Sequence, residues 1–513
     1  MEKRLILAIA LSMLVLLAWS GLAPKEPQPV PVQESKASQI ATQSEKTAIS
    51  KRDLDKGLSS FEESISEETP VSLTTEKSDY NFSESTAALI DVAFTEYQSA
   101  ELSLKYGFLI KDEDLLFMER SSGRGRISFV HRGEGKEIKK DFAFDGDNYS
   151  GEFVLTIKNM SNLKLKMDIP LVLGVMNFKD PLQSRFQSVF IATKDRERHI
   201  SPKKEIEIEG AQIVGLRDKY FCLIVQSEFP EEQSSVYIKR LNGQESEVGL
   251  FLNDLALQPE EEANIKFQIY LGPQDLNQIN LVNKGWGSIV HYGTFDFISQ
   301  LLLQLLTFFN NIVHNWGLAI IMLSLSVYII LFPITLKQMR SMKGMQALQP
   351  RIEELRKQHK DSPQKLNKET MELWREHKVN PFGGCLPLIL QMPVFFALYQ
   401  ALARSVALKG ANFLWIKDLS EPDKLFKLPF TLPILGNYFN ILPILMALLM
   451  VFQQKITMGK GGAGSAEQQK VMMMVMPLMF GVIFYNMPAG LVLYWFTNSL
   501  LMTMYQYKIN RMK

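Results

Sequence analysis

Five long apolar runs follow one another in the last third of the sequence, and they constrain the fold more than any other feature. The runs cover 316–336, 383–404, 434–454, 471–487 and 490–507. Their interiors contain no Asp, Glu, Lys or His, and the only Arg, Arg404, stands at the end of one run. About 20 apolar residues suffice for a helix to cross a bilayer. The sequence therefore predicts an all-α membrane bundle with five spans.

The polar side chains inside these runs are neutral, which disfavours pumps and ion-coupled carriers because those proteins usually need an ionisable group at depth. The candidates for lining a hydrated groove that accepts other chains are Ser324, Tyr328, Gln391, Tyr494, Thr497 and Asn498. Helical spacing puts the first two on one face and the last three on another. The alternative is hydrogen bonding between helices, worth about 0.6 kcal/mol a pair, and spacing alone slightly favours this alternative.

The N-terminal 23 residues are expected to form a sixth span. Lys3 and Arg4 precede a run of apolar residues up to Ala23. A cleaved signal peptide is the alternative, but Pro24 follows the small-residue site and disfavours cleavage. Residues 1–23 are thus predicted to be an uncleaved anchor. Residues 24–87 are rich in Pro, Ser, Glu, Lys and Thr and are predicted to be a disordered exported linker.

Residues 88–284 have the pattern of an exported all-β sandwich. Alternating β-type runs occur at 151–158, 220–225, 236–239 and 265–270, with turn signals at 145–147 and 242–243. A structural domain is favoured over a carbohydrate-binding or partner-docking one. The six His form no metal-binding motif, and the two Cys are far apart. No metal, nucleotide, other cofactor or nucleic-acid substrate is therefore expected.

Between the two parts, residues 295–311 are predicted to form an amphipathic helix. Its polar residues step by three or four and lie on one narrow stripe: Asp296, Gln300, Gln304, Thr307 and Asn311. This composition suits a helix lying flat at the outer membrane interface. A buried helix that caps the sandwich is the alternative. Residues 285–513 then form one C-terminal unit.

The loop after the first C-terminal span is predicted to be cytoplasmic, because it carries eleven Lys/Arg against six Asp/Glu. It reads as a helical hairpin over 337–380, with helices at 338–359 and 363–377. Arg351, Arg356, Lys357 and Trp374 are its candidate contacts with the membrane surface, a ribosome or a targeting factor. Packing of the hairpin on itself alone is an equal alternative. Six spans place both termini in the cytoplasm, although four Lys in the exported loop 405–433 oppose this topology.

Four segments resemble the motifs of the YidC-type membrane protein insertases. They are YLGP at 270–273, NPFGGCLPLILQMPVFFALY at 380–399, FLWIKDL at 413–419 and PAGLVLYW at 488–495. The resemblance is specific over about 285–510. It extends by layout to the anchor and the exported domain, as in bacterial members with a large periplasmic sandwich.

The resemblance implies a monomeric insertase and chaperone of the bacterial inner membrane rather than an enzyme. Its partners would be nascent membrane proteins and lipid, with or without the Sec translocon. It also implies that Gln391 and Tyr494 meet the substrate in the groove. Members usually carry an Arg twelve residues after the Trp that opens the first groove span, and here that position is Tyr328. A weaker dependence on acidic substrate tails is therefore expected.

Two rival functions fit parts of the sequence. One is a small-solute transporter, which ionisable residues or broken helices at the midplane would support. The other is a membrane-anchored envelope scaffold or enzyme that uses the exported sandwich. Deletion of residues 30–280 separates them, because an insertase core keeps working without the sandwich and a sandwich-centred enzyme does not.

Overall fold

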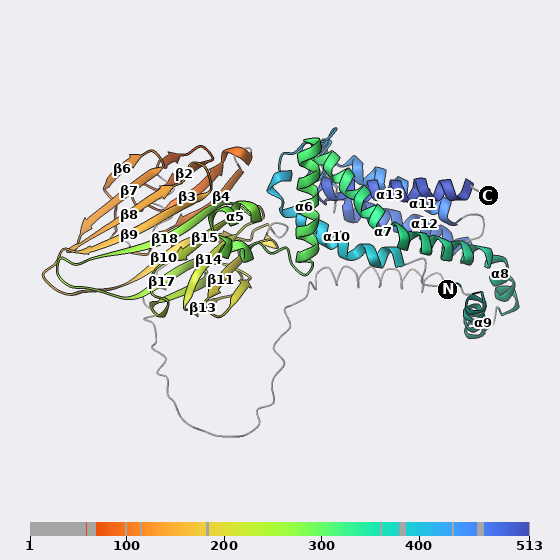
Figure 1. Ribbon diagram of the computed structural model, residues 1–513, viewed down its shortest axis with the longest axis horizontal. Coiled ribbons are helices and arrows are strands. Elements are labelled where there is room, and N and C mark those ends of the chain that lie inside the picture. The colour runs from red at the N-terminus through yellow and green to blue at the C-terminus, as the bar shows by residue number, and fades with distance from the viewer. Residues whose placement is uncertain are drawn as a thin grey trace, which may run out of the picture. The chain divides into compact units, whose positions relative to one another are not determined.

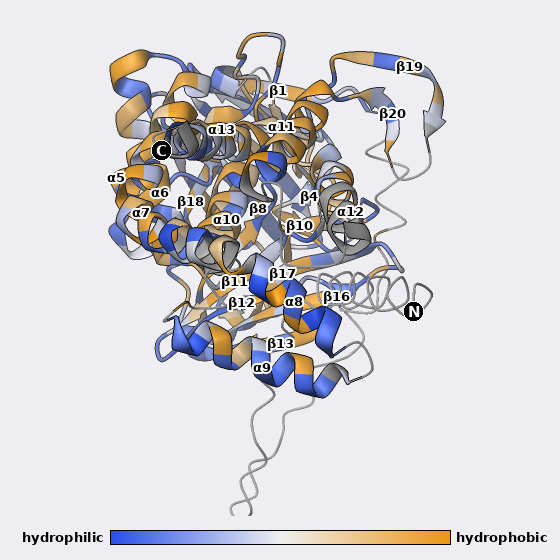
Figure 2. Cartoon of the chain, turned by 90° about the vertical axis from the view of Figure 1, so that its right-hand side faces the viewer, coloured by the Kyte–Doolittle hydropathy of each residue, from blue (hydrophilic) through white to orange (hydrophobic). Residues whose placement is uncertain are grey.

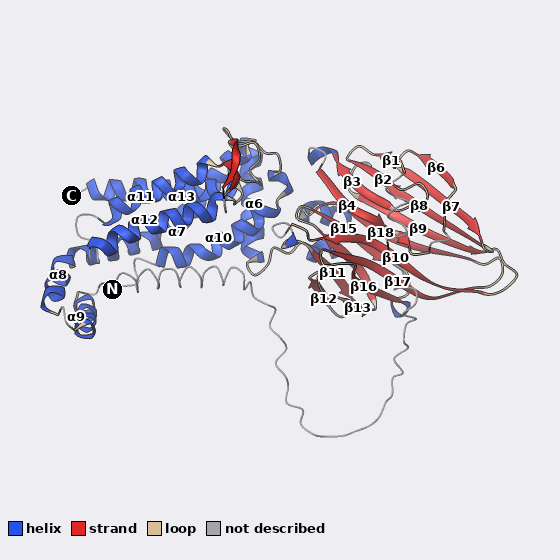
Figure 3. Cartoon of the chain, turned by 180° about the vertical axis from the view of Figure 1, so that it is seen from behind, coloured by secondary structure: helices blue, strands red, loops and turns tan. Residues whose placement is uncertain are grey.

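The computed structural model describes residues 58, 68–97, 100–112, 115–180, 184–359, 362–377, 379, 386–432, 435–458 and 466–511. The predicted anchor at 1–23 and most of the predicted linker lie outside these residues. In Figures 1 and 3 the first half of the described chain consists mainly of strands, and the second half mainly of long helices. The predicted division into a β part and an α part is therefore present.

The strands between residues 71 and 273 form three antiparallel sheets. The four-stranded sheet has the order β1-β2-β3-β4 and contains β1 (Val71–Thr74), β2 (Ser78–Phe82), β3 (Leu89–Phe94) and β4 (Ala100–Gly107). The five-stranded sheet contains, in order, β13 (Ile206–Glu209), β16 (Ser234–Arg240), β17 (Glu245–Leu257), β10 (Leu165–Asn177) and β5 (Leu109–Ile110).

The largest sheet has nine strands. Its order is β12 (Glu197–Ile200), β11 (Ser188–Thr193), β14 (Ala211–Arg217), β15 (Phe221–Ser227), β18 (Glu262–Pro273), β9 (Ser150–Asn159), β8 (Lys136–Phe144), β7 (Arg126–Gly133) and β6 (Glu119–Gly123). The four β-type runs singled out in the sequence coincide with β9, β15, β16 and β18. The two turn signals connect β8 to β9 and β16 to β17, which are paired hairpins.

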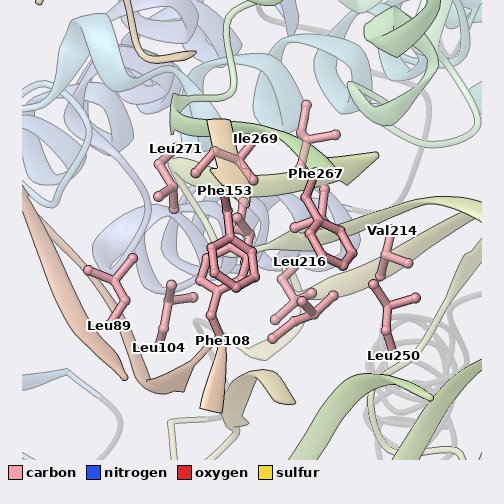
Figure 4. Close-up of a cluster of buried hydrophobic side chains, with 14 of the residues drawn as sticks. Leu89, Leu104, Phe108, Phe153, Val214, Leu216, Leu250, Phe267, Ile269 and Leu271 are labelled. Carbon is pink, nitrogen blue, oxygen red and sulfur yellow. The ribbon is translucent and has the colours of Figure 1, made fainter. Parts of the chain in front are cut away.

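One hydrophobic core joins the three sheets. Leu89 comes from the four-stranded sheet, Leu250 from the five-stranded sheet, and Phe153 and Phe267 from the nine-stranded sheet. All four are fully buried, and they belong to the cluster of buried side chains drawn in Figure 4. Burial of an aromatic or leucine side chain contributes roughly 1.5–3 kcal/mol. The alternation of apolar and polar residues read in the sequence is what supplies this common interior.

The predicted disordered linker ends too late. The prediction includes residues 71–87, but β1 and β2 lie within them. In β2 the alternate residues Ser78, Tyr80 and Phe82 are buried, the last two completely. Two aromatic residues at period two are enough to anchor a strand, although the average composition of 24–87 is that of a disordered chain.

The second half contains α6 (Asp296–Val313), α7 (Trp316–Ala347), α8 (Gln349–Gln358), α9 (Pro363–Glu376), α10 (Leu386–Arg404), α11 (Ile441–Met458), α12 (Ala466–Tyr485) and α13 (Ala489–Arg511). Among the described helices, Asp296–Val313 and Trp316–Ser341 are long and apolar enough to cross a membrane, with mean hydropathy 1.2 and 2.4. Ile441–Ile456 and Val475–Tyr485 are shorter apolar helices. Six spans therefore remain a prediction.

The predicted span 434–454 begins too early. Residues 436–439 form strand β20 (Gly436–Phe439), which pairs with β19 (Phe426–Leu432). Gly436 has φ +83°, which favours a turn rather than a helix. Helix α11 starts at Ile441, where the carboxylate of Asp423 accepts a hydrogen bond from the backbone N–H of Leu442 at 2.7 Å. Apolar content alone cannot separate a short strand from the start of a helix.

The predicted helical hairpin is present with a shifted boundary. Helix α7 continues to Ala347, and the chain breaks at Leu348 before α8 begins. Ser362 and Pro363 start α9 at the predicted N-cap and first helical positions, although the Ser362 side chain makes no capping hydrogen bond to the described part of the chain. Pro350 in the first turn of α8 is a signal for this break, but the apolar periodicity that continues through Leu348 predicts an uninterrupted helix.

Candidate membrane-embedded site

The six predicted groove residues are distributed over α7, α10 and α13. Ser324 on α7 is fully buried. Its hydroxyl donates to the carbonyl of Ile320 at 2.8 Å and lies 3.4 Å from the carbonyl oxygen of Tyr494 on α13. A small side chain at this position lets the two helices approach closely. Ser324 therefore contributes to the packing of α7 against α13.

Gln391 and Tyr494 connect α10 to α13. The Gln391 amide donates to the Tyr494 hydroxyl at 2.9 Å. Tyr494 is fully buried, whereas Gln391 is half-buried. The structure thus brings together two residues that lie 103 positions apart and that the sequence placed in the same groove.

Tyr328 differs from these residues because its hydroxyl is buried without a hydrogen-bond partner in the described part of the chain. Its ring lies 5.8 Å from that of Phe332, which is 4.9 Å from the ring of Tyr505 on α13. Thr497 is nearly buried and Asn498 is half-buried. A hydroxyl without a partner in an apolar setting is costly, and Tyr328 is the predicted groove residue that retains this unused capacity.

These positions fit the interhelical alternative for Ser324, Gln391 and Tyr494, since each side chain bonds to the protein. Sequence periodicity placed them on shared helical faces but could not tell whether a face meets a neighbouring helix or a substrate. Their role as groove residues stays a prediction.

The loop between α10 and α11 is a second feature of this part, and the sequence pointed to it only through the motif at 413–419. Backbone N–H groups at the start of α13 donate to this loop, from Ala489 to Glu421 at 2.7 Å and from Gly490 to Leu419 at 2.9 Å. At the start of α7, a Cβ on Gly317 would lie 2.1 Å from Cγ of Phe413. The loop is therefore seated on the beginnings of α7 and α13.

A cluster of cations and imidazoles joins the β part to the helices, and no sequence motif predicted this cluster. Arg217 on β14 is almost fully buried and donates to the Gln274 side chain at 2.8 and 3.0 Å. It also donates to the His291 carbonyl at 3.1 Å, and Arg404 at the end of α10 donates to the same oxygen. The His199 and His291 rings stack with centroids 5.3 Å apart.

His199 is held neutral in this cluster. Its Nδ1 lies 3.4 Å from the Arg217 guanidinium, which can only donate, so this nitrogen accepts. Its Nε2 then carries the proton and donates to the Ser288 carbonyl at 3.1 Å. Burial, with the charges of Arg217 and His291 adding to it, lowers the pKa of His199 from 6.5 to about 4. Burial also lowers the pKa of His291.

The hairpin of α8 and α9 packs through Leu348, Ile352 and Leu373, and Figure 2 shows mainly hydrophilic colouring over its two helices. Among its predicted contact residues, Arg351 and Lys357 are exposed, while Arg356 and Trp374 are half-buried. Its self-packing is thus observed, and its contacts with other molecules stay a prediction.

Together these parts define a class of protein, namely a helical membrane protein that carries an antiparallel β domain. The family model described as "60Kd inner membrane protein" matches residues 308–513, and that described as "YidC periplasmic domain" matches residues 118–305. The membrane protein insertase YidC of Geobacter sulfurreducens is 34% identical over 385 residues, which cover 74% of this chain and 69% of the relative. That of Pelobacter propionicus is 33% identical over 399 residues, covering 75% and 72%.

The chain belongs to the YidC family of membrane protein insertases. It is accordingly an inner membrane protein with a periplasmic domain, and such insertases are not enzymes. A crystal structure described as an active YidC insertase with its first transmembrane domain resolved is 19% identical, covers 86% of this chain and 92% of that chain, and gives a TM-score of 0.41.

Proposed function

We propose that this chain receives hydrophobic segments of nascent membrane proteins on a polar intramembrane groove formed by α7, α10 and α13, and releases them laterally into the inner membrane. Membership of the YidC family is the basis for proposing the insertase activity. The neutral polar side chains on these three helices support the groove, and among them the Tyr328 hydroxyl has no hydrogen-bond partner among the described residues.

The physical role of the groove is to lower the barrier for the polar flanks of the substrate. A charged side chain at the bilayer centre costs roughly 2.5–3.5 kcal/mol on insertion scales. Transfer of the apolar segment into lipid supplies the driving force, at about 25 cal/mol per Å² of apolar surface. No covalent step and no nucleotide are required for this exchange.

The proposed topology has six spans with both termini in the cytoplasm and the β domain in the periplasm. We place α6 flat at the outer interface. In Figures 1 and 3 α6 runs crosswise to α7 and α13. Its Phe297, Leu301, Phe308 and Ile312 are exposed, as suits a helix that rests on acyl chains. Ser299 on its opposite face donates to the Ala397 carbonyl of α10 at 3.0 Å.

The proposed partners are nascent membrane proteins and the lipid bilayer, and the protein works as a monomer, alone or beside the Sec translocon. The basic hairpin of α8 and α9 lies on the cytoplasmic side in this topology. Its exposed Arg351 and Lys357 are available to a ribosome, a targeting factor or anionic lipid headgroups.

Site-specific crosslinking to a stalled nascent membrane protein tests the groove. A photoreactive residue at Tyr328, Gln391 or Tyr494 is expected to crosslink the substrate, most strongly at half-buried Tyr328 and Gln391. Leu448 on α11 and Leu478 on α12 are exposed and serve as controls for general contact at the lipid-facing surface. Equal yields at the control and groove positions would overturn the groove, while leaving the family assignment intact.

A further inference from the structure

The hairpin of β19 and β20 presents an apolar surface away from the helices. Phe426 and Phe430 on β19 are 51% and 57% exposed, and Leu425 just before it is 39% exposed. The Phe426 ring stacks on that of Phe439 across the hairpin, with centroids 4.9 Å apart. Figure 2 shows the two strands reaching out beside the helices, with hydrophobic colouring along β19. Exposed aromatic side chains on a two-stranded ribbon need an apolar partner.

The base of the hairpin is fixed, so this surface has a defined position. Asn440 accepts from the Lys424 N–H at 2.9 Å and donates to the Tyr485 carbonyl at 2.7 Å. The Tyr485 hydroxyl donates to the Tyr438 carbonyl at 3.0 Å. These bonds tie both strands to the end of α12, and Asp423 ties them to the start of α11. The aromatic side chains therefore lie at the level where apolar helices end.

Cations accompany the aromatic residues. Lys417, Lys424 and Lys427 lie in the same loop. The Lys424 ammonium lies 5.5 Å from the centre of the Tyr438 ring and pairs with Glu421. Aromatic rings mixed with long basic side chains are typical of the zone between headgroups and acyl chains, where the lysine stems lie along apolar surface and the ammonium groups reach the phosphates. The same lysines oppose the rule that basic residues gather in cytoplasmic loops, and headgroup binding gives them a role on the exported side.

We propose that the β19–β20 hairpin inserts Phe426 and Phe430 into the outer leaflet of the inner membrane and that Lys424 and Lys427 bind anionic phospholipid headgroups. The inference goes beyond insertase activity and rests on the proposed topology, which puts loop 405–440 on the exported side. The hairpin then holds the exported ends of α11 and α12 at a fixed depth in the membrane.

The test uses the full chain in vesicles, with Cys222 and Cys385 replaced by Ala and an environment-sensitive dye on F430C. Insertion is expected to shift the dye emission to the blue and to give at least threefold more quenching by phospholipids carrying a shallow nitroxide than the same dye on D147C. Asp147 is an exposed residue in the turn between β8 and β9 and serves as the matched control. Equal, water-like emission at both sites would overturn the proposal.

Two further experiments test the headgroup contact and the outer-leaflet placement separately. In phosphatidylglycerol vesicles, but not in phosphatidylcholine vesicles, K424Q with K427Q is expected to reduce quenching of the F430C dye at least twofold. An equal response in both lipids would overturn the headgroup contact.

In spheroplasts, a membrane-impermeant maleimide is expected to label K417C without permeabilisation. Labelling only after permeabilisation would overturn the outer-leaflet placement together with the topology. Neither experiment depends on insertase activity, so failure of the proposed function would be seen separately in the crosslinking experiment.

Discussion

At the scale of single residues, Tyr328 is the position that sets this chain apart from the pattern expected of its family. Its hydroxyl can exchange hydrogen bonds but brings no positive charge. Its neighbours Phe332 and Tyr505 add aromatic surface rather than cations. An acidic tail passing this side chain therefore gains no Coulombic attraction from it.

Y328R is expected to make insertion depend on substrate acidity. A cation within reach of an acidic tail is worth on the order of 1 kcal/mol in a hydrated groove, or about a fivefold gain in rate. The measurement compares insertion of one substrate with and without added Asp in its exported tail. Y328Q is the neutral control and is expected to behave like the parent chain. A strong acceleration by Asp in the parent chain would show that another group supplies the attraction.

At the scale of elements, the position of the loop between α10 and α11 depends on its close packing against the start of α7. Gly317 leaves the room that Phe413 occupies, because a Cβ there would lie 2.1–2.6 Å from Cγ, Cδ2 and Cβ of the phenylalanine. These atoms belong to the near end of the side chain, so rotation of the ring does not relieve the overlap.

G317A is expected to destabilise the helical part by about 1–3 kcal/mol, the usual cost of forcing extra volume into a packed site. Thermal unfolding in detergent, followed by helical circular dichroism, measures the change. The control is G146A in the turn between β8 and β9, where an added Cβ meets no atom of the described residues within 4 Å. A smaller loss from G317A in an F413A background, which lacks Cγ and the ring, would confirm the overlap, and an unchanged midpoint in G317A alone would contradict it.

Prediction from sequence succeeded where one face of an element is buried and failed where different elements share the same composition. The alternation over 151–158 can be satisfied only by a strand, and β9 is one. The segment from Pro433 to Asn440 is equally apolar as strand or helix, and the capping bond from Leu442 to Asp423, 19 residues earlier in the chain, decides where α11 begins. In the same way, the faces of Ser324 and Tyr494 were visible in the sequence, but the neighbouring helix that covers them was not.

At the scale of the whole molecule, the cluster of Arg217, His199, His291 and Arg404 connects the periplasmic domain to the membrane part. Two guanidinium groups donate to one carbonyl, that of His291. A proton added to either imidazole would place a further positive charge between them. The connection is therefore expected to weaken in acid.

The stability of the chain is expected to fall as the pH drops from 6.5 to about 4. The folded pKa of His199 is depressed to about 4, so between these values the unfolded chain binds more protons and unfolding is favoured as pH falls. The contribution is on the order of 2 kcal/mol. Thermal midpoints against pH for the parent chain and for H199Q measure it, and the variant should show a flatter profile in this window. An identical slope in both proteins would assign the acid sensitivity to other groups.

Deletion of residues 30–280 is expected to leave insertion within a few-fold of the parent chain, because the proposed groove residues all lie on α7, α10 and α13. Insertion of a simple substrate into vesicles is the measurement, with Y328R and the full chain assayed alongside to confirm that the signal reports on the groove. Complete loss of activity in a folded deletion variant would favour a function centred on the β domain.

The pairing of β9 with β18 has a consequence for biogenesis. Glu262 lies opposite Lys158, more than 100 positions earlier in the chain, so the central seam of the nine-stranded sheet cannot close until the end of the domain has emerged. Closure of such long loops is slow, and unpaired strand edges invite association in the meantime. During its own synthesis, this protein must therefore keep a half-built sheet soluble outside the membrane until shortly before its first C-terminal helices arrive, which makes it a demanding cargo for the export machinery that handles it.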